Sequence, residues 1–74
     1  MKNNLRVERA ILNISQEELA TKVGVTRQTI NAIELGKYAP SGVVMMKIAA
    51  ICNKTVNEIF SLEDSDWVAT ATGK

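Results

Sequence analysis

The sequence predicts an all-α fold made of five short helices. Three observations support this prediction. Apolar residues recur three or four positions apart in short segments, as they do on helices that pack one face against a core. Residues that favour helix ends stand between these segments, and no segment predicts a strand. With 74 residues, the chain has room for one small domain.

The first two helices are predicted from their caps. The first spans residues 5–12 and ends before Asn13, because asparagine tolerates the left-handed conformation that terminates helices. Its apolar candidates are Leu5, Val7, Ile11 and Leu12. The second begins after Ser15, which forms a capping box with Glu18 three residues later. It buries Leu19, Ala20 and Val23 and ends at Gly24.

The third helix follows the second after only residues 24–26. Thr26 is its predicted N-cap, Ile30 and Ile33 face inward, and Gly36 closes it. So tight a connection directs one helix across the other, which is the geometry of a helix-turn-helix.

The remaining helices are predicted at residues 42–52 and from Thr55 onward. The fourth follows Pro40 and Ser41, and the fifth opens on a second capping box, formed by Thr55 and Glu58. Their inward-facing candidates are Val44, Ile48, Ala49, Ile51, Val56, Ile59 and Phe60. Residues 1–62 therefore form the predicted folded domain, and residues 63–74 an acidic, flexible tail. Within this tail, Trp67 either folds back on the bundle, joins a dimer contact or is disordered.

The composition argues against several classes of protein. The chain has no histidine, the commonest general base and metal ligand at neutral pH. No carboxylate pair, serine elbow or phosphate-binding loop stands out, so we expect no enzyme, cofactor, metal or small-molecule site. Cys52 is the single cysteine and is predicted to be a reduced core thiol. The chain lacks a signal peptide and any apolar run long enough for a bilayer, which predicts a cytoplasmic protein.

The charges are distributed unevenly. The formal net charge is +1, but residues 1–60 contain eight Lys and Arg against five Asp and Glu. Residues 61–74 contain three acidic residues and one lysine. A mildly basic body with an acidic tail permits binding to nucleic acid but does not require it.

The segment SQEELATKVGVTRQTINAIELGKYAPS, residues 15–41, resembles the core of the lambda-repressor-like helix-turn-helix family, the Cro/Xre group of bacterial and phage regulators. The matching positions are Gln16, Ala20, Gly24, Ile30, Ile33, Glu34, Gly36 and Lys37. The resemblance covers about residues 5–60 and implies a compact bundle of five helices. Gly42 departs from the family, which has a larger apolar residue there, and Leu35 replaces a polar one.

The resemblance implies that the third helix enters the major groove of double-stranded DNA with its N-terminal residues on base edges. Arg27 and Gln28 are then the main readers, since arginine suits guanine and glutamine suits adenine. The other implied base-reading positions are Thr29, Asn31 and Ala32. The implied phosphate contacts are Gln16, Thr26, Lys37 and Tyr38. Other interpretations stay open. Arg27 and Gln28 could be solvated helix residues, and Thr26 could be only a cap. Lys37 could be a plain surface charge, and the ring of Tyr38 could lean on the bundle.

The resemblance further implies a structural salt bridge between Arg9 and Glu34, which would join the first helix to the end of the third. We therefore expect a sequence-specific transcriptional regulator, a repressor, that binds an operator as a homodimer. Two copies on half-sites about one helical turn apart gain affinity and specificity. The alternative is an antitoxin-like or other protein-interaction module on the same fold.

Overall fold

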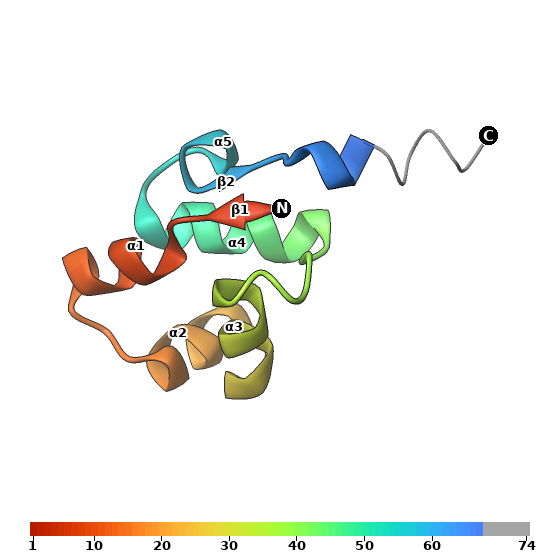
Figure 1. Ribbon diagram of the computed structural model, residues 1–74. Helices are drawn as coiled ribbons and strands as arrows, with labels where there is room; N and C mark the ends of the chain where they lie inside the picture. The colour runs from red at the N-terminus through yellow and green to blue at the C-terminus, as the bar shows by residue number, and fades with distance from the viewer. Residues whose placement is uncertain (68–74) are drawn as a thin grey trace.

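The computed structural model describes residues 1–67, and its architecture is mainly helical (Figure 1). The helices are α1 (Leu5–Leu12), α2 (Gln16–Val23), α3 (Arg27–Glu34), α4 (Gly42–Cys52) and α5 (Val56–Ile59). Two short strands, β1 (Lys2–Asn3) and β2 (Phe60–Ser61), complete these elements, and residues 64–67 form a helical turn. No helix among the described residues is both long and apolar enough to cross a bilayer.

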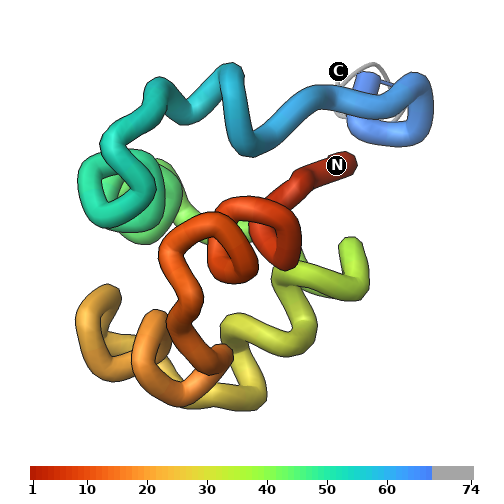
Figure 2. The backbone as a smooth tube through the Cα atoms, turned by 90° about the vertical axis from the view of Figure 1, so that its left-hand side faces the viewer, coloured from red at the N-terminus to blue at the C-terminus, as the bar shows by residue number. Residues whose placement is uncertain are grey.

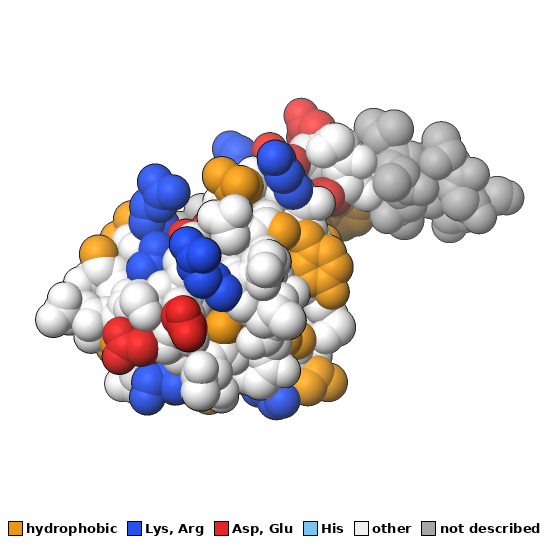
Figure 3. All heavy atoms as spheres, turned by 90° about the horizontal axis from the view of Figure 1, so that it is seen from below, with side chains coloured by type: hydrophobic (Ala, Val, Ile, Leu, Met, Phe, Trp, Pro, Cys, Tyr) orange, Lys and Arg blue, Asp and Glu red, His pale blue; other side chains and the backbone are white. Residues whose placement is uncertain are grey.

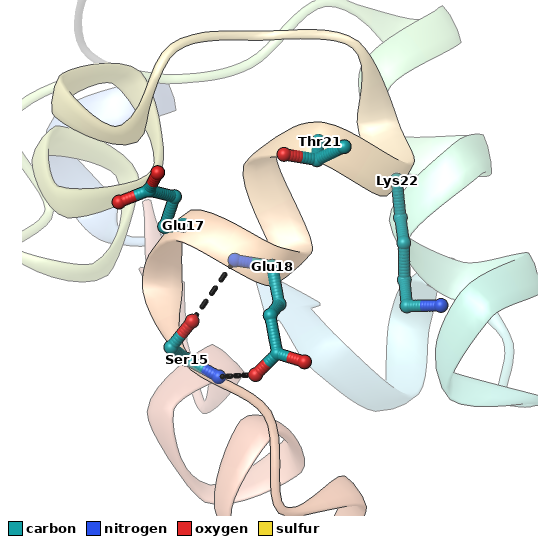
Figure 4. A pocket seen from close by; sticks show the side chains of 5 residues that line it. All are labelled: Ser15, Glu17, Glu18, Thr21 and Lys22. Atoms are coloured by element: carbon teal, nitrogen blue, oxygen red, sulfur yellow. Dashed lines mark hydrogen bonds between the residues drawn. The ribbon is translucent and has the colours of Figure 1, made fainter.

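The predicted caps define where the helices begin and end. Both capping boxes are present, at Ser15 with Glu18 and at Thr55 with Glu58. Figure 4 shows the first one, at the N-terminus of α2. Helix α4 begins at Gly42 because the side chain of Ser41 accepts a hydrogen bond from the backbone N–H of Val44. Ser41 is thus the N-cap of α4, and the helix starts at Gly42 as predicted.

The core is built from one face of each helix. Leu5 of α1, Leu19 of α2, Ile30 and Ile33 of α3 and Ile48 of α4 are almost completely buried. Ile59 and Phe60 close the core at the end of α5. Burying a side chain of this size contributes about 1.5–3 kcal/mol, so these residues fix which face of each helix points outward.

The buried face of α1 differs from the one predicted. Val7 and Ile11 are 56% and 65% exposed, whereas Glu8 is buried. The prediction counted only apolar residues as core candidates, but residues 5 and 8 lie on one helical face and the second of them is charged. Glu8 is buried because Lys54 lies 2.8 Å from its Oε2. This ion pair, which the sequence did not suggest, joins α1 to the turn between α4 and α5.

The substitution Ile11→Gln is expected to change the free energy of unfolding by less than about 0.5 kcal/mol, because the side chain is mostly in water. Urea denaturation of the variant and the wild type measures the difference. A loss above about 1 kcal/mol would mean that Ile11 is covered in solution, within one molecule or by another.

The two strands were not predicted. They pair antiparallel, with Lys2 opposite Ser61 and Asn3 opposite Phe60, and bring the two ends of the fold together (Figure 2). Strands of two residues are too short for the alternation that reveals a strand in a sequence. The side chain of Asn3 fixes this arrangement, because its Nδ2 donates to the carbonyl of Ile33 at 2.8 Å and its Oδ1 accepts from Leu5 N–H.

The described part of the predicted tail contains a helical turn and contacts the N-terminus. Residues 64–67 are helical, and the Met1 ammonium lies 2.8 Å from Glu63 and 3.2 Å from Asp66. Trp67 does not fold back into the core, since it is 62% exposed. Residues 68–74, the rest of that predicted tail, lie outside the described residues.

Candidate nucleic-acid interface

Helices α2 and α3 form the predicted helix-turn-helix at one end of the molecule (Figure 1). Gly24 has a positive φ of 88°, a conformation that glycine adopts without steric cost. In this turn, the N–H groups of Gly24 and Val25 both donate to the carbonyl of Ala20, at 2.8 and 3.0 Å. Because Ile30 and Ile33 are buried, the opposite face of α3 is directed away from the core.

The first turn of α3 presents two polar side chains that the fold does not use. Arg27 and Gln28 are exposed, and neither side chain has a hydrogen-bond or ion-pair partner among the described residues. Both can form two parallel hydrogen bonds to one ligand group. Their groups are therefore available for a planar, hydrogen-bonding partner such as a base edge.

Thr26 and Thr29 are partly occupied by capping α3. The hydroxyl of Thr26 accepts from the backbone N–H of Thr29 at 3.2 Å, and the two hydroxyl groups lie 3.0 Å apart. Either hydroxyl can still contact a ligand, but both also stabilise the start of the helix. Ala32 is half-buried and can offer only a methyl group.

Gln16 connects α2 to the polar face of α3. Its Nε2 donates to Oε1 of Glu34 at 3.0 Å and to Oδ1 of Asn31 at 3.1 Å. The two N–H donors of its amide are thus used within the protein. The predicted contact between this side chain and a phosphate remains a prediction, and these hydrogen bonds give Gln16 a second role.

The expected pair of Arg9 and Glu34 is present and lies next to Gln16. Arg9 Nε is 2.6 Å from Oε2 of Glu34, and its terminal Nη2 is 3.2 Å from Oε1. The remaining Nη1 donates to the carbonyl of Ile14 at 3.0 Å. A bidentate pair with a further backbone acceptor holds α1, the connection before α2 and the end of α3 together.

The charge state of Glu34 follows from these contacts. Burial opposes its ionisation, but the hydrogen bonds from Arg9 and Gln16 outweigh burial, and the pKa of the Glu34 carboxyl is lowered. Hydrogen bonding to Glu34 likewise raises the pKa of Arg9. At neutral pH the pair is therefore fully charged.

Lys37 and Tyr38 follow α3 and are exposed, where they could contact a DNA backbone beside the helix. The end of the molecule that carries α2 and α3 is seen from below in Figure 3. In this view its Lys and Arg side chains are spread over the surface, with a few carboxylates among them, rather than gathered into one patch. We therefore expect a moderate electrostatic contribution to the free energy of binding. Specific hydrogen bonds should contribute a larger share.

A shallow hollow lies on the outer face of α2 (Figure 4). Its lining residues are Ser15, Glu17, Glu18, Thr21 and Lys22. All of them belong to α2 or its N-cap, so no second element closes the hollow. It therefore adds nothing to the interface formed by α3.

Two long-range contacts were missed by sequence reasoning, and one of them supports the interface. Lys47 of α4 donates to the carbonyl of Val23 at 3.3 Å and so binds the C-terminal end of α2. The ion pair of Glu8 and Lys54 lies near Cys52, and burial together with the Glu8 charge raises the pKa of that thiol. A lysine 24 positions from its acceptor leaves no signal in a single sequence.

Comparisons with known proteins agree with this geometry. A helix-turn-helix family model matches residues 5–59. The chain is similar to an uncharacterised HTH-type transcriptional regulator of Methanocaldococcus jannaschii, with 50% identity over 66 residues, 89% of this chain and 100% of the relative. A similar regulator of Bacillus subtilis is 42% identical over 66 residues, 89% of this chain and 100% of the relative. The chain therefore belongs to the Cro/Xre-type helix-turn-helix family of DNA-binding transcriptional regulators.

Proposed function

We propose that this protein is a sequence-specific repressor that inserts α3 into the major groove of operator DNA in the cytoplasm. The observation that carries the proposal is the free pair of Arg27 and Gln28 on a helix whose opposite face is fixed in the core. Arginine and glutamine at this end of a recognition helix suit guanine and adenine edges. Repression needs no further group, because a protein bound over a promoter excludes other proteins from it.

Within this proposal, side chains of α3 read the bases, and residues outside α3 contact the DNA backbone. Arg27, Gln28, Thr29 and Asn31 face bases, and the Ala32 methyl group can contact only a thymine methyl. The residues that position the helix on the phosphates are Gln16, Thr26, Lys37 and Tyr38.

Selection from random duplexes tests this function. The full chain is expected to enrich one sequence motif and to bind it at least about a thousandfold more tightly than scrambled DNA. The repressor assignment is then checked with a reporter gene carrying the motif in its promoter, whose expression should fall. If the protein enriches no motif, it does not read DNA, and the protein-interaction module becomes the better hypothesis.

We also propose that the protein acts as a homodimer through its C-terminal end. Leu62 and Trp67 are 59% and 62% exposed. Leu62 lies at a mostly apolar groove of about 380 Å³ whose other linings include Met45, Val56 and Phe60. Water-exposed apolar groups next to an open groove favour association, and a dimer would place two copies of α3 on two half-sites.

The double variant Leu62→Ser with Trp67→Ser is expected to be monomeric at tens of micromolar, whereas the wild type sediments as a dimer. Ile11→Ser is the matched control, because Ile11 is equally exposed but lies on α1, and it should remain dimeric. A wild type that is itself monomeric would exclude the dimer. If the Ile11 variant alone dissociates, the contact lies on α1.

A further inference from the structure

The C-terminal end of α3 is bound by Asn3, a residue of β1. The side-chain Nδ2 of Asn3 donates to the carbonyl of Ile33 at 2.8 Å. Carbonyls at the end of a helix have no partner in the next turn, and this one also accepts from the N–H of Gly36 at 3.0 Å. The carbonyl of Met1 lies 3.8 Å from the position that a Cβ atom at Gly36 would occupy. The strand β1 and the turn after α3 are therefore in close contact.

The same strand binds the C-terminal segment of the fold. In the two-stranded sheet, the backbone of Asn3 lies opposite Phe60, which is buried in the core. The chain continues from this strand to Leu62 and Trp67, the residues proposed to join two copies. Figure 2 shows β1 between the C-terminal segment and the end of α3. The strand is thus a direct connection between the helix proposed to read DNA and the segment proposed to form the dimer.

The hydrogen bond from Asn3 restrains α3 in a way that the core does not. Ile30 and Ile33 anchor the inner face of α3, but hydrophobic contacts are non-directional. A hydrogen bond weakens steeply with distance and angle, so a bond at the end of the helix restrains its tilt. The pair of Arg9 and Glu34 restrains the same end, but toward α1 and not toward the C-terminal segment.

We propose that Asn3 is a positioning residue that sets the spacing between the two half-sites of the operator. This inference rests on the proposed function, in which two copies joined at their C-terminal ends each place one α3 on a half-site. The distance and angle between the two helices then depend on how α3 is connected to the dimer contact. Asn3 binds both sides of that connection, through its side chain on α3 and its backbone on β2.

The consequence is a strict preference for one spacing. One added base pair moves a half-site about 3.4 Å along the DNA axis. It also turns the half-site by about 35°, since a helical turn takes about 10–10.5 base pairs. A dimer whose reading helices are rigidly connected can follow this change only by deforming the DNA or losing contacts. Without the hydrogen bond from Asn3, α3 can tilt, and the dimer should tolerate more than one spacing.

The test titrates the full-length protein against duplexes with the selected half-sites at the selected spacing and at one base pair more or less. For the wild type, each change should weaken binding about tenfold or more, which is similar to the effect of a mismatched base pair. Asn3→Ala should reduce this penalty to about two- to threefold, because one hydrogen bond accounts for a factor of about two to ten. Its affinity for a duplex with a single half-site should be unchanged, which shows that the variant is folded and still reads DNA.

Asn3→Asp separates the two hydrogen bonds of the side chain. An aspartate can still accept from the N–H of Leu5, but it has no donor for the carbonyl of Ile33. It should therefore relax the spacing preference as much as Asn3→Ala does. Asn4→Ala is the matched control, because the side chain of this neighbouring asparagine donates to the carbonyl of Glu58 at 3.4 Å and not to α3. This variant should keep the strict preference.

Several results would overturn the inference. If the Asn3 variants weaken binding equally at all spacings, Asn3 only stabilises the fold. If Asn4→Ala relaxes the preference as much as Asn3→Ala, the strand matters but the Asn3 amide does not. A wild type that accepts all three spacings equally has no preference for Asn3 to set. These results leave the proposed function standing, because the wild type still binds paired half-sites. If the wild type selects only a single half-site, or no motif, the proposed function and this inference fail together.

Discussion

Arg9→Ala and Glu34→Ala are each expected to lower the free energy of unfolding by about 3–5 kcal/mol, because each leaves a buried charge without its partner. The Glu34 side chain is almost completely buried, and Arg9 is mostly covered. Removing Arg9 leaves the Glu34 carboxylate without its ion-pair partner. Removing Glu34 leaves the Arg9 guanidinium unpaired and deprives Gln16 of an acceptor. In so small a domain, which buries only about 60% of its unfolded surface, either loss is a large part of the total stability.

Urea denaturation of each variant at pH 7 measures this effect. Arg6→Ala is the matched control, because Arg6 is exposed and its Nε lies 3.9 Å from Oε1 of the same glutamate. An exposed pair of this kind contributes about 0–1 kcal/mol. Losses below about 0.5 kcal/mol for Arg9→Ala would show that the pair is not buried in solution.

The pH dependence of this pair has a definite sign. The folded-state pKa of Glu34 lies below its ordinary value of 4.5, so its contribution to stability is present above that value and is lost as the pH falls through the folded-state pKa. The difference in stability between the wild type and Glu34→Gln should therefore shrink on acidification. A difference that stays constant down to pH 3 would contradict the assignment.

The helices could be predicted from the sequence because their signals are local. Caps such as Ser15 with Glu18 act within four residues, and the structure places α2 and α4 at the predicted bounds. The strands could not be predicted, since Asn3 and Phe60 meet only after the chain has folded. The prediction of the buried face of α1 was wrong for a similar reason. Glu8 is buried because it pairs with a lysine 46 positions away in the sequence.

In the candidate site, too, only the features with local signals could be predicted from the sequence. The register of α3 follows from Ile30 and Ile33, so the outward position of Arg27 and Gln28 could be predicted from the sequence. The hydrogen bonds of Gln16 could not, because they depend on how closely the N-terminus of α2 approaches the C-terminal half of α3. That distance is a product of helix packing, and only the structure brings residue 16 to residues 31 and 34.

A second large effect is expected in DNA binding. Gln28→Ala should lose about 1–3 kcal/mol per half-site on the selected motif, because a pair of hydrogen bonds to one base disappears. Its loss on scrambled duplexes should be much smaller, since no base is read there. Arg27→Ala should behave in the same way if Arg27 reads guanine. Titration of matched and scrambled duplexes at two or more salt concentrations measures the loss of affinity for each duplex.

Lys37→Ala is the control that distinguishes contacts to the DNA backbone from contacts to the bases. Lysine on a phosphate neutralises one charge whatever the base sequence, so this variant should weaken matched and scrambled duplexes about equally. It should also lower the slope of log affinity against log salt by about one unit per site. Gln28→Ala should leave that slope unchanged, because glutamine carries no charge. If Gln28→Ala instead weakens binding to both duplexes equally, the first turn of α3 contacts the DNA backbone. The residues that read bases must then lie elsewhere on the protein.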